Sequence, residues 1–248
     1  MNWALLFAAG ILGGLTGSIA GLASVATYPA LLLAGLPPVT ANVTNTVALV
    51  FNGVGSALGS RPELRGQGRW ILGTLPVAVL GGAAGAALLL STPAEGFEKA
   101  VPFLLGFASV AILLPRRPAA PDSPGNHRAR RALEALAIFA ICIYGGYFGA
   151  AAGVLLLALF LRIEHASLAE ANAAKNVILG IANAVAAVVF AVLAPVHWWA
   201  VLVLGLGCLL GSRLGPVVVR HAPPGPLRVV IGVAGVALAV KLGLDAYR

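Results

Sequence analysis

The stretch GGLTGSIAG at residues 13–21 places four glycines inside a long apolar run, and the stretch GGYFGAAAG at residues 145–153 repeats their spacing. Each glycine of the second tract lies 132 residues after its counterpart in the first. Because similarity that recurs at a fixed offset indicates internal duplication, the two tracts predict two homologous halves. Apolar segments that glycines interrupt at corresponding places in two halves are typical of secondary transporters.

Other matched pairs continue this correspondence in the same order along the chain. They are Ala41-Asn42 with Ala171-Asn172 at an offset of 130, Asn52 with Asn183 at 131, and Gly81 and Gly85 with Gly207 and Gly211 at 126. Offsets that fall along the chain are expected when the second half has shorter loops. We predict one transmembrane domain, 1–248, built from repeat one at 1–115, a basic cytoplasmic linker at 116–134 and repeat two at 135–248.

The composition of the chain points to lipid as its solvent. Hydrophobic residues make up 60% of the 248 residues and charged residues only 10%, whereas a soluble chain carries about 25% charged residues. The net charge of +8 comes mainly from short arginine clusters between apolar runs. This pattern is typical of cytoplasmic loops in a membrane protein and argues against nucleic-acid binding.

The lengths of the apolar runs predict the helical segments. The runs span 4–34, 41–59, 70–90, 100–114, 135–161, 168–193, 197–219 and 226–244. A helix needs about 20 apolar residues to cross the hydrocarbon core, so most runs fit one crossing, while the glycine-rich runs 4–34 and 135–161 look interrupted. We predict an all-α polytopic membrane protein with two pseudo-symmetric, inverted repeats of about four helical segments each. The first segment of each repeat is broken or re-entrant.

Two topologies remain open. If all eight runs cross once, the loops at 61–69 and 116–131 share one side, and the loop with Arg220 falls on the other. If run 135–161 is instead a re-entrant hairpin, Arg162 and Arg220 join the basic side and the second half becomes inverted. We favour the hairpin because it gathers nearly all loop arginines in the cytoplasm.

Polar side chains mark the start of two corresponding runs, 41–59 and 168–193. Amides in hydrocarbon must find partners, so these side chains face the protein interior, either as hydrogen bonds between helices or as the lining of a site. An intramembrane lysine either extends to the headgroups or lines a polar cavity. The candidates are Asn42, Thr44 and Asn45 in the first run and Asn172, Lys175 and Asn176 in the second.

The glycine tracts contribute four further candidates, Gly17, Gly21, Gly149 and Gly153. One interpretation is close helix packing through small residues. The other is a helix break within the membrane, where backbone N–H groups and a positive helix end face an anion. The two interpretations are compatible, and we expect these glycines to line the substrate site.

The sequence lacks the ligands that a cation would need. No Asp or Glu lies in the middle of an apolar run, and the chain has only one Met. We therefore expect no metal site, no cofactor and no catalytic residue. Amides, hydroxyls, glycine N–H groups and one lysine are donors that suit an anion. Export of an anion from a negative cell interior gains about 2.3 kcal/mol per charge per 100 mV, so a proton relay is not required.

The order of these motifs resembles the sulfite exporter TauE/SafE family of membrane permeases, the 4-toluene sulfonate uptake permease family. The resemblance covers residues 4–243. It includes the glycine-rich first segment, then Pro29 and Leu31–Leu33, then residues 41–46, and an echo of this plan from Gly145 to Asn183. It implies a multi-pass permease of the bacterial cell inner membrane that moves sulfite or another sulfur-containing organic anion, usually outward.

From residues and resemblance together we predict a secondary transporter that exports a small anion, sulfite or an organosulfonate. An anion channel and a non-transporting accessory protein are the alternatives. The expected partners are the small anionic substrate and the lipid bilayer, with no nucleic acid. The sequence leaves assembly as a homodimer open.

The hairpin topology predicts opposite accessibility at two positions, Glu95 and Arg220. Single cysteines placed there, in a chain whose Cys142 and Cys208 are changed to Ala, should react with a membrane-impermeant thiol reagent from opposite sides of the membrane. Labelling of both positions from the same side would rule the hairpin out.

Overall fold

The structure is a computed structural model that describes residues 2–113, 127–163 and 167–221, together with isolated positions between 229 and 244. Over these residues the chain is helical and contains no strand. The helices are α1 Trp3–Ala20, α2 Ala23–Leu33, α3 Pro38–Gly59, α4 Gly68–Ser91, α5 Ala94–Leu113, α6 His127–Tyr147, α7 Ala152–Ile163, α8 Leu168–Leu193 and α9 Trp198–His221.

Four of these helices, α1, α4, α8 and α9, are long and apolar enough to cross a membrane. Large apolar side chains are exposed along them; Leu72 on α4 is 65% exposed and Val192 on α8 is 77% exposed. Lipid, not water, is the solvent that such a surface requires. The prediction of an all-α multi-pass membrane protein is confirmed.

The long first run is broken into two helices at Gly21. The helix α1 ends at Ala20 and α2 begins at Ala23. Gly21 closes α1 in the left-handed conformation, with a φ of 79°, and its N–H donates to the Gly17 carbonyl at 2.7 Å. Glycine adopts this conformation without the steric cost that a Cβ atom would bring, so the sequence fixes the position of the break.

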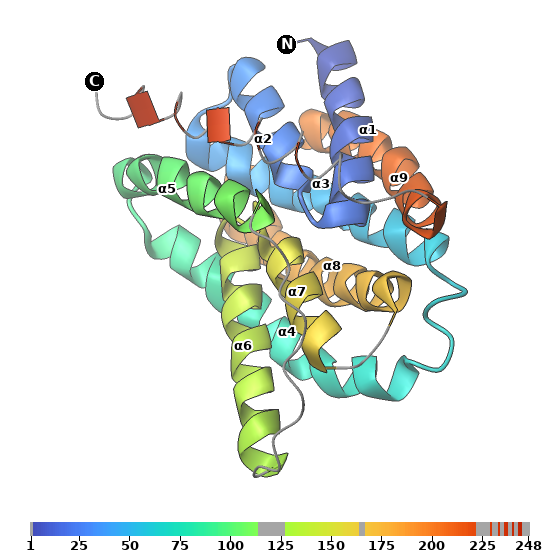
Figure 1. Cartoon of the computed structure of the whole chain (residues 1–248). Helices are drawn as coiled ribbons and strands as arrows, with labels where there is room; N and C mark the ends of the chain where they lie inside the picture. The colour runs from blue at the N-terminus through green and yellow to red at the C-terminus, as the bar shows by residue number, and fades with distance from the viewer. Residues whose placement is uncertain are drawn as a thin grey trace.

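The glycine-rich run of the second half breaks in the same manner. The helix α6 ends at Tyr147, Gly149 has a φ of 72°, and α7 begins at Ala152. In Figure 1, α1 runs inward from the top of the view and α6 runs inward from the bottom, so that both end near the middle of the molecule.

The two breaks touch each other through glycine. A Cβ atom added to Gly21 would overlap the backbone of Gly153, and one added to Gly153 would overlap the backbone of Gly21. Only residues without side chains allow two chain segments to approach so closely. The last glycines of both tracts therefore serve close packing as well as the helix breaks.

The broken helices pack across the molecule rather than against their own sequence neighbours. The helix α1 lies along α9, and α6 lies along α4, while α3 crosses α8 between them. The seams are made of small residues: Gly14 meets the backbone of Cys208, and Gly85 meets the backbone of Ile143. Close backbone approach lets dispersion forces hold helices together where lipid offers no hydrophobic driving force.

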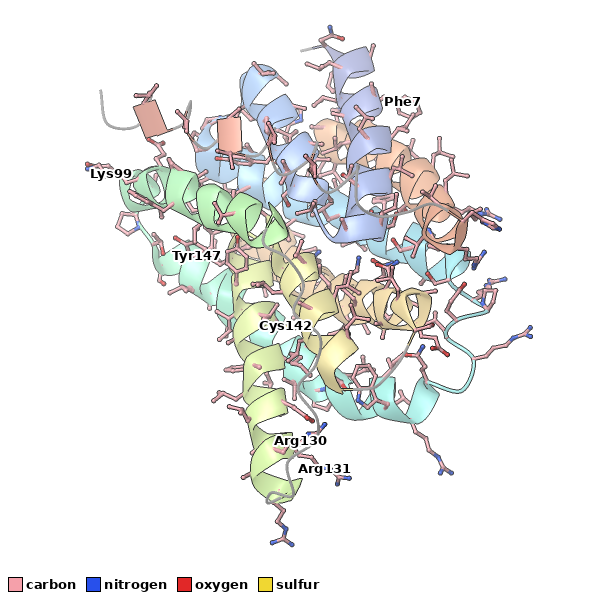
Figure 2. All side chains as sticks on the ribbon, in the orientation of Figure 1. Phe7, Lys99, Arg130, Arg131, Cys142 and Tyr147 are labelled. Atoms are coloured by element: carbon pink, nitrogen blue, oxygen red, sulfur yellow. The ribbon has the colours of Figure 1, made fainter. Side chains whose placement is uncertain are left out.

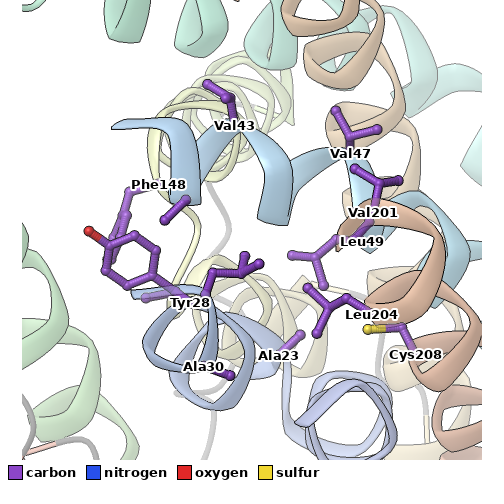
Figure 3. Close-up of a cluster of buried hydrophobic side chains, with 14 of the residues drawn as sticks. Ala23, Tyr28, Ala30, Val43, Val47, Leu49, Phe148, Val201, Leu204 and Cys208 are labelled. Atoms are coloured by element: carbon purple, nitrogen blue, oxygen red, sulfur yellow. The ribbon is translucent and has the colours of Figure 1, made fainter. Parts of the chain in front are cut away.

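An aromatic contact fixes α2 against the second break. The rings of Tyr28 and Phe148 meet edge to face, with centroids 5.3 Å apart and an interplanar angle of 86°. Both side chains are almost fully buried within the cluster of Figure 3, which also contains Val43, Leu49 and Leu204. This cluster ties α2, α3, α9 and the α6–α7 connection together.

One end of the molecule gathers three helix ends. Arg220, near the end of α9, forms an ion pair with Glu63 and donates to the Gly59 carbonyl at 2.8 Å. Gln67 donates to the carbonyl of Glu170, at the start of α8, at 3.3 Å. The hydrogen bond from Arg220 holds the pKa of the Glu63 carboxyl below its usual range. The end of α3, the start of α8 and the end of α9 therefore lie together.

The boundary of α6 differs from the linker expected at 116–134. The helix already begins at His127, so residues 127–134 are helical. Arg130 donates to Glu134 at 2.9 Å, an i,i+4 pair that supports a helical turn. Figure 2 shows Arg130 and Arg131 at the outer end of α6. Residues 114–126, and most of run 226–244, lie outside the described residues.

The helix α5 also begins earlier than the run at 100–114 indicates. It starts at Ala94, where Lys99 pairs with Glu95 at 2.6 Å across one helical turn. Charged side chains at a helix end do not register in an apolar pattern, which explains both differences.

Two glycines with similar backbone conformations separate strain from packing. Gly21 has a φ of 79° and lies against Gly153, whereas Gly35 has a φ of 92° and nothing within 4 Å of its missing Cβ. We expect Gly35→Ala to cost about 1–2 kcal/mol of stability, the cost of the left-handed conformation alone. Gly21→Ala should cost clearly more, because backbone atoms must separate.

Thermal unfolding of the two purified variants in detergent measures this difference. Equal losses for Gly21→Ala and Gly35→Ala would show that the contact between the two breaks contributes nothing.

Candidate functional site

Three donors on one face of α8 converge on the inner end of α1. Lys175 Nζ lies 3.2 Å from the Gly17 carbonyl and 3.3 Å from the Ser18 carbonyl. Asn172 and Asn176 donate their amide N–H groups to the same Ser18 oxygen at 2.9 and 3.1 Å. The last carbonyls of a helix have no partners within the helix and carry its negative partial charge. The α8 side chains supply those partners.

Lys175 is 0% exposed. Its ammonium group is held inside the protein at the end of α1, so of the two orientations considered from the sequence, the structure shows the interior one. Spacing of three and four residues along α8 brings Asn172, Lys175 and Asn176 to one face.

The first half places related side chains at the other break. Asn42, on α3, donates to the Tyr147 carbonyl at the end of α6 at 2.8 Å. Asn45 donates to the hydroxyl of Ser24 at 3.1 Å. The Thr44 hydroxyl accepts the backbone N–H of His197 at 3.1 Å. These buried groups join α3 to α6, to α2 and to the start of α9.

A small cavity of about 20 Å³ lies between the two breaks, room for roughly one water molecule. Five helices contribute to its wall: α1, α2, α3, α6 and α8. Its glycines are Gly17, Gly21, Gly53, Gly145, Gly149 and Gly180. Its polar side chains are Ser24, Thr46, Asn52, Asn176 and Asn183. Both glycine tracts therefore meet at one polar hollow.

The ten residues expected at the site fall into two groups. Those that line the cavity are Gly17, Gly21, Gly149 and Asn176. Those that lie outside its lining are Asn42, Thr44, Asn45, Gly153, Asn172 and Lys175. The second group supports the first: Gly153 packs on Gly21, and Lys175 bonds the carbonyl of Gly17.

Four polar residues of the lining were not among the expected site residues: Ser24, Thr46, Asn52 and Asn183. Signals for three of them were present in the sequence. Thr46 continues the polar stripe of α3, and Asn52 and Asn183 form a matched pair between the halves. Ser24 gave no such signal, because its place in the wall follows from the turn at Gly21.

Several donors at the cavity have unused capacity. The Ser24 hydroxyl accepts from Asn45, so its own proton remains available for another acceptor. No side chain caps the N-terminus of α2, where Ala23 and Ser24 line the wall. Asn183 is 7% exposed and forms no hydrogen bond. Buried polar groups without partners are unusual and call for a ligand or water.

The cavity lining carries no charged side chain. In the described part of the chain, no group of three or more His, Cys, Asp or Glu residues is placed to hold a metal ion. The wall thus offers hydroxyl, amide and backbone donors at a positive helix end, with Lys175 one residue layer behind. This arrangement can hold an anion by neutral donors and a fixed nearby charge.

Comparisons with known proteins agree with a membrane transporter. Residues 6–242 match the sequence profile of the family described as sulfite exporter TauE/SafE. A probable membrane transporter protein of Sinorhizobium is 28% identical over 98% of this chain and 92% of its own length. Similar proteins named probable membrane transporter occur in Haemophilus influenzae, at 25% identity over 98% of this chain and 94% of its own length, and in Escherichia coli K12, at 26% over 98% and 90%. No solved structure matches.

The two asparagine contacts predict unequal effects of the same truncation. Asn172→Ala leaves the Ser18 carbonyl with Lys175 and Asn176 as donors, whereas Asn42→Ala leaves the Tyr147 carbonyl without its side-chain donor. We expect Asn42→Ala to lower stability by about 1–3 kcal/mol, the cost of an unsatisfied buried group, and Asn172→Ala by less.

Thermal unfolding of the two purified proteins tests this order. Because both changes remove the same side chain from a buried site, the difference isolates the helix-end carbonyl. A larger loss for Asn172→Ala would contradict the assigned hydrogen bonds.

Proposed function

Because the chain belongs to the TauE/SafE sulfite exporter family of membrane transporters, we propose that it is a secondary transporter that exports a small anion, sulfite or an organosulfonate. The observation that carries this proposal is the cavity between the two helix breaks, which both glycine tracts line with neutral donors. The proposal assigns no catalytic residue. It places the protein in the bacterial inner membrane, where the arginine-rich loops face the cytoplasm.

The anion site of this proposal consists of the cavity wall and the charge behind it. Ser24 and the N-terminus of α2 donate from one side, and Asn176 and Asn183 from α8. Lys175 supplies the compensating charge through its position behind Gly17. Burial of an anion without such a charge would cost several kcal/mol.

The proposed architecture is a pair of pseudo-symmetric inverted repeats, one before and one after the basic linker. Reciprocal contacts support it. Gly81 packs on Phe139 and Cys142, and Gly207, 126 residues later, packs on Phe7 and Gly10. These partners are themselves 132 residues apart, which is the offset of the glycine tracts. The first half's α4 thus contacts α6 as the second half's α9 contacts α1.

The contact of Gly21 with Gly153 fits the same symmetry. The two residues correspond to each other at the offset of 132 and touch each other, as residues on a two-fold axis do. The asparagine contacts are also reciprocal, since Asn42 bonds the end of α6 and Asn172 the end of α1.

The hairpin topology gains support from the ends of the helices. Arg220 contacts the loop that carries Glu63, and Arg61–Arg69 is one of the basic stretches. In the alternative in which all eight runs cross once, Arg220 and Glu63 would lie on opposite sides of the membrane.

A carrier fits the enclosed cavity better than an open pore. The hollow has room for roughly one water molecule, so its walls must separate before a sulfur oxyanion enters. The walls belong to two groups of helices, α1, α3 and α9 on one side and α4, α6 and α8 on the other. Where α3 crosses α8, Gly53 and Gly180 are in contact without side chains between them. We propose that the two groups rock about this crossing.

Sulfite efflux from proteoliposomes tests the transport function. We expect efflux to rise when the liposome interior is made negative, because the anion leaves down its potential. Lys175→Gln, which keeps a donor but removes the charge, should lower the rate at least about tenfold, equivalent to 1.4 kcal/mol of lost stabilisation.

Lys99→Gln is the matched control, since it removes one positive charge at a side chain that is 49% exposed on α5. Efflux from Lys99→Gln should equal that of the wild type. Wild-type efflux no faster than from protein-free liposomes would refute the transport function.

A further inference from the structure

The buried charge around the cavity amounts to a single cation. Among the described residues, Lys175 is the only charged side chain that is buried. The cavity lining adds none, and its polar groups are neutral hydroxyls and amides. The other charged contacts of the structure, Glu63 with Arg220, Glu95 with Lys99 and Glu134 with Arg130, lie at the ends of helices.

This single charge sets how much negative charge the site can hold. A singly charged anion beside Lys175 leaves the protein interior neutral overall. A doubly charged anion leaves one negative charge in excess, and a buried charge without a partner is strongly unfavourable. The N-terminus of α2 contributes only about half a positive charge, which is not enough to compensate a second negative charge.

The half that lacks a lysine strengthens this argument. At the offset of 130 that relates Asn42 to Asn172, the counterpart of Lys175 is Asn45. Asn45 donates to Ser24, which lines the cavity, so this position lies as near to the wall as Lys175 does. A symmetric site would carry two cations and suit a dianion, but this chain carries one.

We infer that the site, if it binds anions as proposed above, selects the singly charged form of a sulfur oxyanion. Sulfite is then bound and carried as hydrogensulfite, and organosulfonates are accepted through their singly charged headgroup. Sulfate and the fully deprotonated sulfite ion are excluded by charge, although their size and oxygen geometry are similar.

Three sodium salts test this selection on the purified wild-type protein, with thermal unfolding in detergent at constant ionic strength as the measurement. Methanesulfonate carries one charge throughout the working pH range, and sulfate carries two. We expect methanesulfonate to protect equally at pH 6 and pH 8, and sulfate to bind at least about tenfold more weakly.

Sulfite changes from its singly to its doubly charged form near neutral pH, so its apparent affinity should fall between pH 6 and pH 8 while that of methanesulfonate does not. No residue that lines the cavity titrates, and Lys175 is the charged group behind it. Methanesulfonate therefore controls for any titration of the protein itself.

Asn45→Lys adds a second cation at the counterpart position and should raise the affinity for sulfate relative to methanesulfonate. Its control is Asn45→Gln, which keeps an uncharged amide. Should Asn45→Lys not fold, the wild-type salt series decides the question.

The outcomes separate the two proposals. Equal protection by sulfate and methanesulfonate, or a sulfite affinity that rises with pH, overturns the charge selection and leaves the anion site standing. No protection by any of the three salts overturns the anion site and the selection together.

Discussion

An interrupted helix inside a membrane has carbonyl groups that neither water nor its own turns can satisfy, and the rest of this structure depends on how those groups are bonded. Each such group would cost several kcal/mol if it faced hydrocarbon. Here the end of α1 is bonded by three side chains of α8, and the end of α6 by Asn42 of α3. These contacts require α3 and α8 to lie at the centre, which in turn places the two breaks face to face.

The same bonds explain a buried lysine. A cation in a low-dielectric interior is costly, but at a helix C-terminus it meets partial negative charge and carbonyl acceptors. Lys175 therefore holds α1 in place and brings positive charge within one residue of the cavity. A single side chain links the stability of the break with the electrostatics of the proposed site.

The helix breaks and the buried polar stripe could be predicted from the sequence because local chemistry determines them. Gly21 and Gly149 permit a backbone conformation that other residues resist, and an amide or lysine in an apolar run must face inward. The partners of Lys175 could not be predicted in this way. They require knowledge that α1 ends against α8, a contact between residues 157 and 158 positions apart. The role of Ser24 was missed for the same reason, and the start of α6 because arginines and Glu134 obscure the apolar pattern.

The crosswise packing of the broken helices has a consequence for biosynthesis. The helix α1 finds its main neighbour, α9, only when nearly the whole chain has been made, since α9 begins at Trp198. Until then its glycine seam has only lipid beside it, and lipid cannot interlock with a flat surface as another helix can. Contacts between such distant segments slow folding. The emerging first half is therefore an incomplete intermediate that depends on insertion machinery or chaperones to protect it until the second half arrives.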